Sequence, residues 1–469
     1  MIDDKKQGAN GAPATDLGQR SISRKDALTA GAAVAAGLAG LSALGGAETA
    51  LASSPTRSSA ATDVTLTMWS QDPLYVKFFK SRSTEFSALP QNKNYTISYN
   101  ITQIPTANIF PKLLSTLAAG SGAPDIATLE INAFSTFEKG DLLAKGMVNL
   151  KPLIGSQYND FLQQRWIPYT YKGAVYGVES GLSPSCLYYR QDILSKAGLK
   201  PPFMTYDDLV TAGRLLKKKT GQAILLSPLV DIATFSQMFQ QVGGHYFNAS
   251  GELTLDDSKA VSLLTYLVNG HKEGIFYGLN DPYSPPAFAA YQQAKLASVL
   301  MPDWYGDQFL KLSVPNESGL WRIQVLPTST LGGGSVSCWG GTGIGVTKQS
   351  KHQQLAWQFL HYAYMNRANQ IKRFQEIHYF PTMKAVLNDP AITSGTDPYY
   401  GGQKIGGLYA SVASKVPVQY QSPYWNQVLY SGPNSVVVEY SLAMLGKKSP
   451  SQAIKDAVAG AKKIMSQPV

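Results

Sequence analysis

The sequence predicts an α/β protein made of two lobes, and three observations lead to this prediction. The chain has 469 residues. One hydrophobic core rarely organises so long a chain, so two lobes of roughly 150 to 200 residues each are expected. Hydrophobic residues make up 44% of the chain and charged residues 15%, which is typical of a folded protein and not of a disordered one. From Asp63 onward, strand-like and helix-like patterns alternate, as they do in helix-covered parallel sheets.

The first lobe is predicted to begin with three strands and two helices. Apolar residues alternate with threonines over 64–68, which indicates a strand that ends in a loop over 70–73. Residues 95–101 and 126–129 are interpreted as the next strands, and 110–119 as the helix between them. The helix after the first loop has one apolar face. That face carries Val76, Phe79 and Phe86.

Two later helices are predicted from their starts. Thr205 and Asp208 have the spacing of a capping box, and so do Ser350 and Gln353. In both cases an apolar helical stripe follows, so the two motifs are interpreted as helix starts rather than as functional sites.

Residues 1–52 are predicted to be an export signal and residues 53–62 a disordered linker. The basic pair Arg24-Lys25 precedes an apolar stretch over 27–47, and a small-x-small cleavage site follows at 50–52. This order of basic, apolar and small residues is typical of a secretory signal.

The type of signal is predicted from residues 23–28, which resemble a twin-arginine signal. Lys25 stands where that pattern has its second arginine, and Ala27 stands where Phe is usual. The Sec route and a retained membrane anchor stay open as alternatives. Leu41 occupies the place of the cysteine that a lipid-anchored protein would carry, so the expected product is free in the periplasm or outside the cell.

The charge and the cysteines exclude other classes of protein. The net charge is +10, but the longest basic run, Lys217 to Lys219, falls at the end of a predicted helix, where cations favour the helix dipole. We therefore expect no nucleic-acid partner. Cys186 and Cys338 are the only cysteines, which is neither a disulfide scaffold nor a zinc-binding spacing, and no metal site is predicted.

Several motifs of the chain, taken together, resemble the family 1 extracellular solute-binding proteins, the group that includes maltose-binding protein. The likeness runs through most of the chain after the signal. Arg190 departs from it, because the family usually has Asn there. The motifs are Gly122-Ala123-Pro124-Asp125-Ile126, Tyr176-Gly177-Val178, Leu187-Tyr188-Tyr189-Arg190, Lys196-Ala197-Gly198-Leu199, Gly340-Gly341-Thr342-Gly343-Ile344-Gly345 and Ala356-Trp357-Gln358-Phe359-Leu360.

This resemblance implies the type II two-lobed periplasmic-binding-protein fold, in which each lobe is a sheet flanked by helices. We place the hinge crossings near Leu182, Pro327 and Pro381. The first lobe would then comprise 63–181 and 328–380, and the second 182–327 and 381–469. Ligands in such sheets bind at the carboxyl ends of the strands, and hinge closure lets both lobes contribute contacts.

The resemblance also implies the function of an extracytoplasmic binding component of an ABC importer. Such a protein captures a carbohydrate between its lobes and delivers it to membrane permease subunits. We expect a monomer that needs no cofactor and catalyses no reaction.

Ligand contacts are predicted where aromatic and short polar side chains follow predicted strands or fall in cleft-lining segments of the family. A sugar offers an apolar ring face and a belt of hydroxyls, so its site needs aromatic platforms beside polar groups. The predicted ligand-binding residues are Trp69, Gln71, Asp72, Glu130, Asn132, Asp303, Trp304, Trp339, Gly340, Tyr424 and Trp425. Core packing or a solvated surface position is the alternative for each tryptophan and each carboxylate.

Other ligands and a catalytic function stay open as alternatives. Adjacent Tyr188 and Tyr189 are compatible with iron, but the five histidines are scattered along the chain. A polyamine would need clustered acids, and an anion would need a cation or a helix amino terminus. A glycoside-acting enzyme would need two suitably spaced carboxyl groups, and no hydrolase or phosphate-loop motif is present.

Cys186 and Cys338 both fall close to the crossings that the resemblance implies. We predict that they lie near enough to form a disulfide in an oxidising compartment. Two small buried thiols are the alternative.

Overall fold

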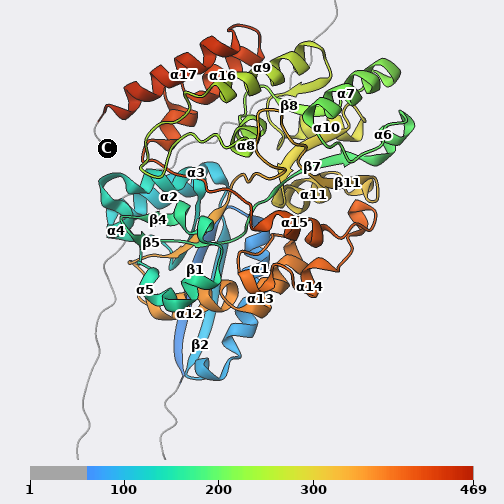
Figure 1. The fold of residues 1–469 in the computed structure, drawn as a ribbon. Helices are drawn as coiled ribbons and strands as arrows, with labels where there is room; N and C mark the ends of the chain where they lie inside the picture. The colour runs from blue at the N-terminus through green and yellow to red at the C-terminus, as the bar shows by residue number, and fades with distance from the viewer. Residues whose placement is uncertain (1–60, 468–469) are drawn as a thin grey trace, which may run out of the picture. The chain divides into compact units, whose positions relative to one another are not determined.

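The structure, a computed structural model, describes residues 61–467 (Figure 1). The predicted export signal, and the predicted linker as far as residue 60, lie outside the described residues. Among the described residues, none of the helices has the length and apolar character that crossing a membrane requires.

The first sheet has five strands in the order β2-β1-β3-β12-β6. β1 pairs in parallel with β2 and β3, whereas β12 runs antiparallel to β3 and β6. The carboxyl ends of β1 and β3 therefore open toward the same edge of the sheet. The bounds are β1 Thr62–Ser70, β2 Tyr95–Gln103, β3 Ile126–Glu130, β6 Val178–Glu179 and β12 Thr342–Val346.

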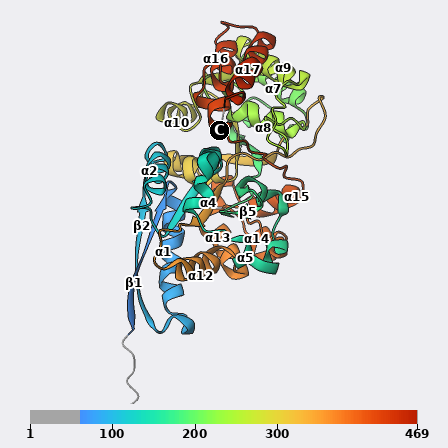
Figure 2. The ribbon, with the colours of Figure 1, turned by 90° about the vertical axis from the view of Figure 1, so that its left-hand side faces the viewer.

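Helices cover the first sheet (Figure 2), and aromatic side chains pack beneath them. α1 (Pro73–Ser87) buries Val76, Phe79 and Phe86, the three residues of the predicted apolar face. Phe79 packs edge-on against Phe359 of α12, with ring centroids 5.6 Å apart. The other helices of this region are α2 Thr106–Ala119, α4 Leu142–Gly146, α12 Gln353–Tyr364 and α13 Arg367–Ile377.

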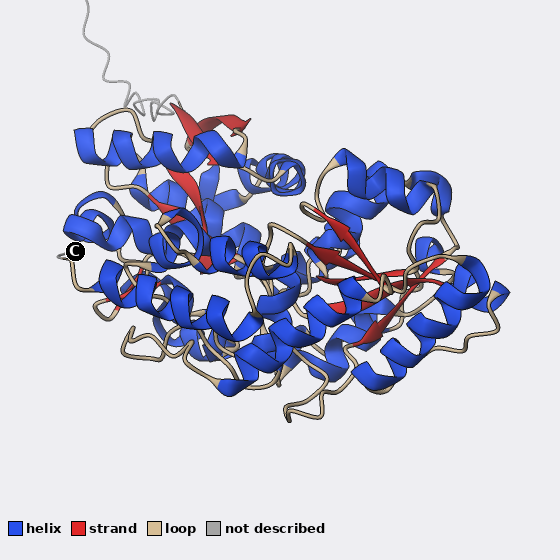
Figure 3. Ribbon diagram, turned by 90° about the horizontal axis from the view of Figure 1, so that it is seen from above, coloured by secondary structure: helices blue, strands red, loops and turns tan. Residues whose placement is uncertain are grey.

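A second set of strands is built around β7, which lies between β10 and β11 and runs antiparallel to both. β8 and β9 form a parallel pair, and backbone hydrogen bonds from Ala223 to Lys295 and from Ala297 to Ala223 place β8 beside β10. Figure 3 shows the strands in two separate groups, each with helices around it. The bounds are β7 Ser185–Arg190, β8 Leu225–Pro228, β9 Phe276–Leu279, β10 Ser298–Pro302 and β11 Trp321–Val325.

Helices of the middle and the end of the chain cover this second group, where α16, α17 and α9 lie together (Figures 1 and 2). These helices are α7 Tyr206–Thr220, α8 Ala233–Gln241, α9 Ser258–Lys272, α10 Pro285–Gln292, α16 Val436–Met444 and α17 Pro450–Met465. The remaining short elements are α3 Ile131–Phe134, α5 Lys151–Ile154, α6 Gln191–Lys196, α11 Lys311–Ser313, α14 Pro390–Thr393, α15 Ile405–Ala413, β4 Thr170–Tyr171 and β5 Ala174–Val175.

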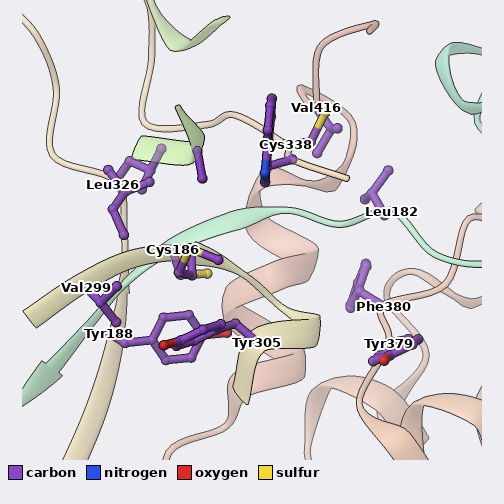
Figure 4. Packing of buried hydrophobic residues seen from close by; sticks show 14 of the residues in the cluster. Leu182, Cys186, Tyr188, Val299, Tyr305, Leu326, Cys338, Tyr379, Phe380 and Val416 are labelled. Atoms are coloured by element: carbon purple, nitrogen blue, oxygen red, sulfur yellow. The ribbon is translucent and has the colours of Figure 1, made fainter. Parts of the chain in front are cut away.

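Three chain segments run side by side between the two groups of strands. The backbone nitrogen of Leu182 donates to the carbonyl of Phe380 at 2.8 Å, and that of Ser185 donates to Ser337 at 2.9 Å. Figure 4 shows Leu182, Cys338 and Phe380, one from each segment, near one another. The lobe boundaries placed near Leu182, Pro327 and Pro381 stay predictions.

The predicted elements of the first sheet are present, with shifted ends. α2 begins at Thr106 rather than at residue 110, although Pro111 lies inside it. The capping box at Thr205 and Asp208 is confirmed, because each side chain bonds to the other residue's backbone nitrogen.

The capping box predicted at Ser350 is wrong. Ser350 Oγ donates to Asp125 Oδ1 at 2.5 Å and accepts from the backbone of His352, while α12 begins only at Gln353. The serine joins the helix to the first sheet instead of capping it.

The predicted disulfide is not formed, because Cys186 and Cys338 are both buried free thiols. Cys338 Sγ lies 3.5 Å from an Arg165 nitrogen and 3.5 Å from the carbonyl of Pro417. Cys186 Sγ lies instead 3.9 Å from the carbonyl of Pro184.

Candidate ligand-binding site

A cavity of about 500 Å³ lies where strand ends of both sheets meet the crossing segments. The carboxyl ends of β1 and β3 supply side chains from the first sheet, and those of β8, β9 and β10 supply side chains from the second group of strands. Its lining is Gln71, Asp72, Tyr75, Thr106, Glu130, Asn132, Gly181, Ser183, Asp231, Tyr283, Asp303, Trp304, Gln308, Phe309, Trp339, Gly340, Gly341, Thr342, Tyr379 and Tyr430.

The predicted ligand-binding residues divide into two groups by their place in the structure. Eight of the eleven line this cavity, from four separate stretches of the chain, and the other three do not. The eight are Gln71, Asp72, Glu130, Asn132, Asp303, Trp304, Trp339 and Gly340. Whether they contact a ligand stays a prediction.

Asp72 ends the loop after β1 and caps α1. Its Oδ1 accepts from the backbone nitrogen of Leu74 at 2.7 Å, and its Oδ2 accepts from the Tyr379 hydroxyl at 2.5 Å. Burial raises the pKa of Asp72 to about 6, against the lowering effect of these hydrogen bonds. Both carboxylate oxygens thus have protein partners, and one of them ties the start of α1 to a crossing segment.

Glu130 lies at the end of β3. Only its Oε1 accepts a side-chain hydrogen bond, whereas both carboxylate oxygens of Asp72 have protein partners. Asn132 Nδ2 donates to Glu130 Oε1 at 2.8 Å, while Asn132 Oδ1 accepts from the indole nitrogen of Trp425 at 3.1 Å. Burial raises the pKa of Glu130 to about 7, and the hydrogen bonds from Asn132 act in the opposite direction. A ligand hydroxyl that donated to the Glu130 carboxylate would offset the cost of burying its charge.

Asp303 follows β10 and joins that strand to a crossing segment. Its two oxygens accept from the backbone nitrogens of Trp304, at 2.8 Å, and Phe380, at 2.7 Å. Burial raises the pKa of Asp303 to about 7. Because both bonds are to the protein backbone, Asp303 holds Trp304 in place.

Trp304 is one of two tryptophans in the cavity lining. Its indole nitrogen donates to the carbonyl of Trp339 at 3.0 Å. Tyr283 stacks on it, with ring centroids 6.2 Å apart and planes inclined by 25°. The backbone of Gly340 passes so close that a Cβ there would lie 3.3 Å from the indole nitrogen. The Trp304 ring is therefore held at its indole nitrogen by the Trp339 carbonyl and on one face by Tyr283.

The floor of the cavity is fixed by a buried ion pair beneath Gly340 and Gly341. One Arg165 nitrogen donates to Glu179 Oε2 at 2.9 Å and to the carbonyl of Gly340 at 3.1 Å. Glu179 Oε1 accepts from the backbone nitrogen of Thr342 at 3.1 Å. A side chain at Gly341 would lie 2.3 Å from Arg165, so this loop can approach the ion pair only as glycine.

Three predicted residues lie outside the cavity lining. The Trp69 ring is covered by Lys112 Nζ at 4.2 Å from its centroid, and the Tyr424 hydroxyl donates to the carbonyl of Gln467 at 2.5 Å. Trp425 is only 3% exposed and packs against Tyr246, with ring centroids 5.9 Å apart.

The sequence reasoning missed several lining residues, among them Asp231, Tyr283 and Tyr430. Asp231 follows β8 and Tyr283 follows β9, so a search after every strand of the second group would have found both. Asp231 Oδ1 accepts from the backbone nitrogen of Ala233 at 2.7 Å, and burial raises the pKa of Asp231 to about 6. Tyr430 lies in a helical stretch, where no strand end signals it.

The lining combines aromatic faces with carboxyl, amide and hydroxyl groups, and none of the residues that line the cavity is Lys, Arg or His. Such a set suits a neutral polyol better than an anion. Over residues 61–467, no group of three His, Cys, Asp or Glu side chains has the arrangement of a metal site.

Comparison with protein families gives one match that spans most of the folded chain. The sequence profile of the family described as bacterial extracellular solute-binding protein matches residues 84–397. An arabinooligosaccharide-binding protein of Bacillus subtilis is 33% identical over 304 residues, which cover 64% of this chain and 68% of that protein. A lactose-binding protein of Rhizobium radiobacter is 26% identical over 415 residues, covering 84% and 92%.

Solved structures give the same fold. The GacH receptor of Streptomyces glaucescens, solved unliganded and in complex with acarbose, superposes with a TM-score of 0.72 at 17% identity, covering 87% of this chain and 100% of that one. An ABC substrate-binding protein of Listeria monocytogenes in complex with cycloalternan gives 0.68 at 22% identity, covering 87% and 100%. These likenesses confirm the predicted two-lobed periplasmic-binding-protein fold. The family profile and the arabinooligosaccharide-binding relative identify the chain as a member of the bacterial extracellular solute-binding proteins.

Proposed function

We propose that this protein captures a neutral oligosaccharide in the cavity between its two sheets and delivers it, unaltered, to the permease of an ABC importer. The observation that carries this proposal is the Trp304 ring, stacked on Tyr283 and held at its indole nitrogen so that it lies fixed against the cavity. Family membership supports export and solute binding, and the sugar is our inference.

A sugar would use both kinds of group in the lining. Its apolar ring face would stack on Trp304, and its hydroxyls would donate to carboxylates such as Glu130 and Asp231. The volume of about 500 Å³ falls within the range of about 300–1,000 Å³ that small-molecule sites occupy.

The ligands named for the relatives suggest which sugars to test first. The relatives include binding proteins for arabinooligosaccharides, lactose and galactooligosaccharides. We infer that short neutral oligosaccharides of this kind are the ligand class here, with arabinooligosaccharides first because those relatives have the highest identity of the three.

A polyamine is the second candidate, because four carboxyl side chains line the cavity. They are Asp72, Glu130, Asp231 and Asp303. Asp72 and Asp303 are committed on both oxygens to the protein, which leaves two carboxyl groups for a multiply charged cation. A charged ligand would show binding that weakens steeply with salt, whereas a neutral sugar would not.

A glycoside-acting enzyme would also need two free carboxyl groups around the sugar. Glu130 and Asp231 are the remaining pair, but each lies on a different sheet and nothing else in the lining points to a hydrolytic role. Incubation with a labelled oligosaccharide distinguishes the two functions, because a binding protein returns the sugar intact and a hydrolase returns fragments.

Trp304→Ala tests the proposal by removing the stacking surface. We expect the dissociation constant for the best-bound oligosaccharide to rise at least tenfold, which is about 1.4 kcal/mol, measured by isothermal titration calorimetry. The melting temperature should fall, because the variant also loses the stacking on Tyr283 and the hydrogen bond to Trp339, but the protein should still unfold in one cooperative transition.

Trp69→Ala is the matched control, because it removes the same side chain from a position outside the cavity lining. Its affinity should equal that of the wild-type protein. Equal affinities for wild type and Trp304→Ala would remove Trp304 from the site.

The route of export and the lobe boundaries belong to the same proposal. We infer that a twin-arginine-like signal over residues 1–52 directs export, and that the chain crosses between lobes near Leu182, Pro327 and Pro381. Closure of the lobes on the sugar would shift the protein toward the form that the permease recognises.

A further inference from the structure

We propose that Trp425 is a positioning residue that acts through Asn132 to fix Glu130 as a hydrogen-bond acceptor for the ligand. This inference rests on the proposed binding of an oligosaccharide in the cavity. It assigns to Trp425 a role other than stacking on the sugar.

The first step is that Trp425 cannot present its ring face to the cavity. Its side chain is 3% exposed and does not belong to the lining. Tyr246 packs against it edge-on, with ring centroids 5.9 Å apart, and Phe247 packs at 5.8 Å. The ring is therefore part of the core that surrounds the second group of strands.

The second step is the hydrogen bond that leaves this core. The indole nitrogen of Trp425 donates to Asn132 Oδ1 at 3.1 Å. Asn132 belongs to α3, which follows β3 of the first sheet. An indole nitrogen can only donate, so it forces the amide of Asn132 to present oxygen to Trp425 and nitrogen toward Glu130.

The third step is that the amide orientation of Asn132 acts on Glu130, a side chain of the cavity lining. Asn132 Nδ2 donates to Glu130 Oε1 at 2.8 Å, and both side chains line the cavity. An amide turned the other way would present its oxygen to Glu130 and repel the carboxylate. Trp425 therefore selects the amide orientation that stabilises Glu130 in its ionised, accepting form.

A second contact ties the same two chain segments together. Lys139 Nζ donates to Gln427 Oε1 at 2.7 Å and lies 5.5 Å from the centroid of the Tyr424 ring. Residues 424–427 thus hold residues 132–139 at two points, so Trp425 and Asn132 stay in register.

Glu130 shares the cavity with other titratable groups. They are Asp72, Asp231 and Asp303, together with Tyr75, Tyr283, Tyr379 and Tyr430, while Tyr169, Glu179 and Arg165 lie beneath the floor next to Gly341. The pKa values of the three aspartates lie at about 6 to 7, so they contribute to any pH profile of the whole protein. The comparison between variants isolates the part that belongs to Glu130.

Trp425→Phe is the test, because it keeps an aromatic ring in the core and removes the indole donor together with part of the ring, a loss of volume that the control variant below shares. We expect the affinity for the best-bound oligosaccharide at pH 7 to fall about threefold to tenfold, which is the effect expected for the loss of one hydrogen bond. Affinity should rise with pH as Glu130 ionises, and the midpoint of that rise should move to higher pH in the variant, because the Asn132 bonds that lower the pKa of Glu130 are weakened.

Asn132→Ala provides the second variant and closes a double-mutant cycle. It should show the same upward shift of the midpoint, and adding Trp425→Phe to it should change neither the affinity nor the midpoint further. Trp166→Phe is the matched control, since it removes an indole donor bonded at 3.0 Å to the carbonyl of Tyr158, outside the cavity lining. Its affinity and midpoint should match the wild type.

The outcomes separate this inference from the proposed function. Failure of the wild-type protein to bind any sugar overturns both. Binding by the wild type with an unmoved midpoint in Trp425→Phe, or with effects of Trp425→Phe and Asn132→Ala that multiply, overturns the positioning role alone.

Discussion

At the scale of single residues, the cavity shows why polar side chains at its edge have different roles. Asp72 and Asp303 direct both carboxylate oxygens to the protein, and their bonds to Tyr379 and Phe380 tie both sheets to one crossing segment. Glu130 and Asp231 keep an oxygen available. In the sequence the four acids look alike, since each lies at or just after the end of a strand. Only the structure distinguishes Asp72 and Asp303, which bond to a crossing segment, from Glu130 and Asp231, which can accept from a ligand.

Gly340 is the residue whose role can be tested most simply. Its φ is +76°, and a Cβ would lie 3.3 Å from the indole nitrogen of Trp304. Gly340→Ala should therefore cost about 1–2 kcal/mol of stability from the left-handed backbone and also displace the Trp304 ring. We expect sugar affinity to fall several-fold in calorimetric titrations.

Gly402→Ala is the control for that experiment. Its φ is +81°, but nothing lies within 4 Å of the added Cβ. It should lose comparable stability in thermal unfolding and bind sugar like the wild type. If Gly340→Ala lost stability but bound normally, the close approach to Trp304 would have no part in binding.

The aromatic predictions show the limit of reasoning from sequence at this scale. Trp304 and Trp339 reach the cavity, whereas Trp69 lies under Lys112 and Trp425 is buried in the core. All four were predicted from their position after a strand or in a family segment. Which face of a ring is covered depends on neighbours distant in sequence, such as Tyr246 beside Trp425, and no local pattern encodes that contact.

At the scale of elements, helices and strands were predicted well where the pattern depends only on residues close together in the sequence. Alternation in β1 and the apolar face of α1 depend only on nearby residues, and both are confirmed. The cap predicted at Ser350 failed because the serine bonds to Asp125, which is 225 positions away in the sequence. A distant partner outcompeted the local motif.

The capping box of α7 gives a prediction at this scale. Thr205 accepts from the backbone nitrogen of Asp208, and Asp208 accepts from that of Thr205. Thr205→Ala should lower the free energy of unfolding by about 1 kcal/mol, and Thr205→Ser should restore most of it. Urea denaturation measures both.

Sugar affinity should be unchanged in both variants, because neither residue of the box lines the cavity. A loss of stability in Thr205→Ser as large as in Thr205→Ala would show that the methyl group, and not the hydrogen bond, stabilises the helix start.

At the scale of the whole folded unit, one geometric rule accounts for the site. The carboxyl ends of β1 and β3 from the first sheet, and of β8, β9 and β10 from the second group of strands, all contribute side chains to the same cavity. This is the expected place for a ligand in sheets of this kind. The rule was applied to the first sheet and to β10 in the sequence, but not to β8 and β9, which is why Asp231 and Tyr283 were missed.

The most direct test of this account is a crystal structure of the protein with an arabinooligosaccharide. We predict one intact sugar chain in the cavity, with a ring stacked on Trp304 and a hydroxyl donating to Glu130. A sugar bound elsewhere on the protein, or cleaved in the cavity, would contradict the proposed capture of an unaltered neutral oligosaccharide between the two sheets.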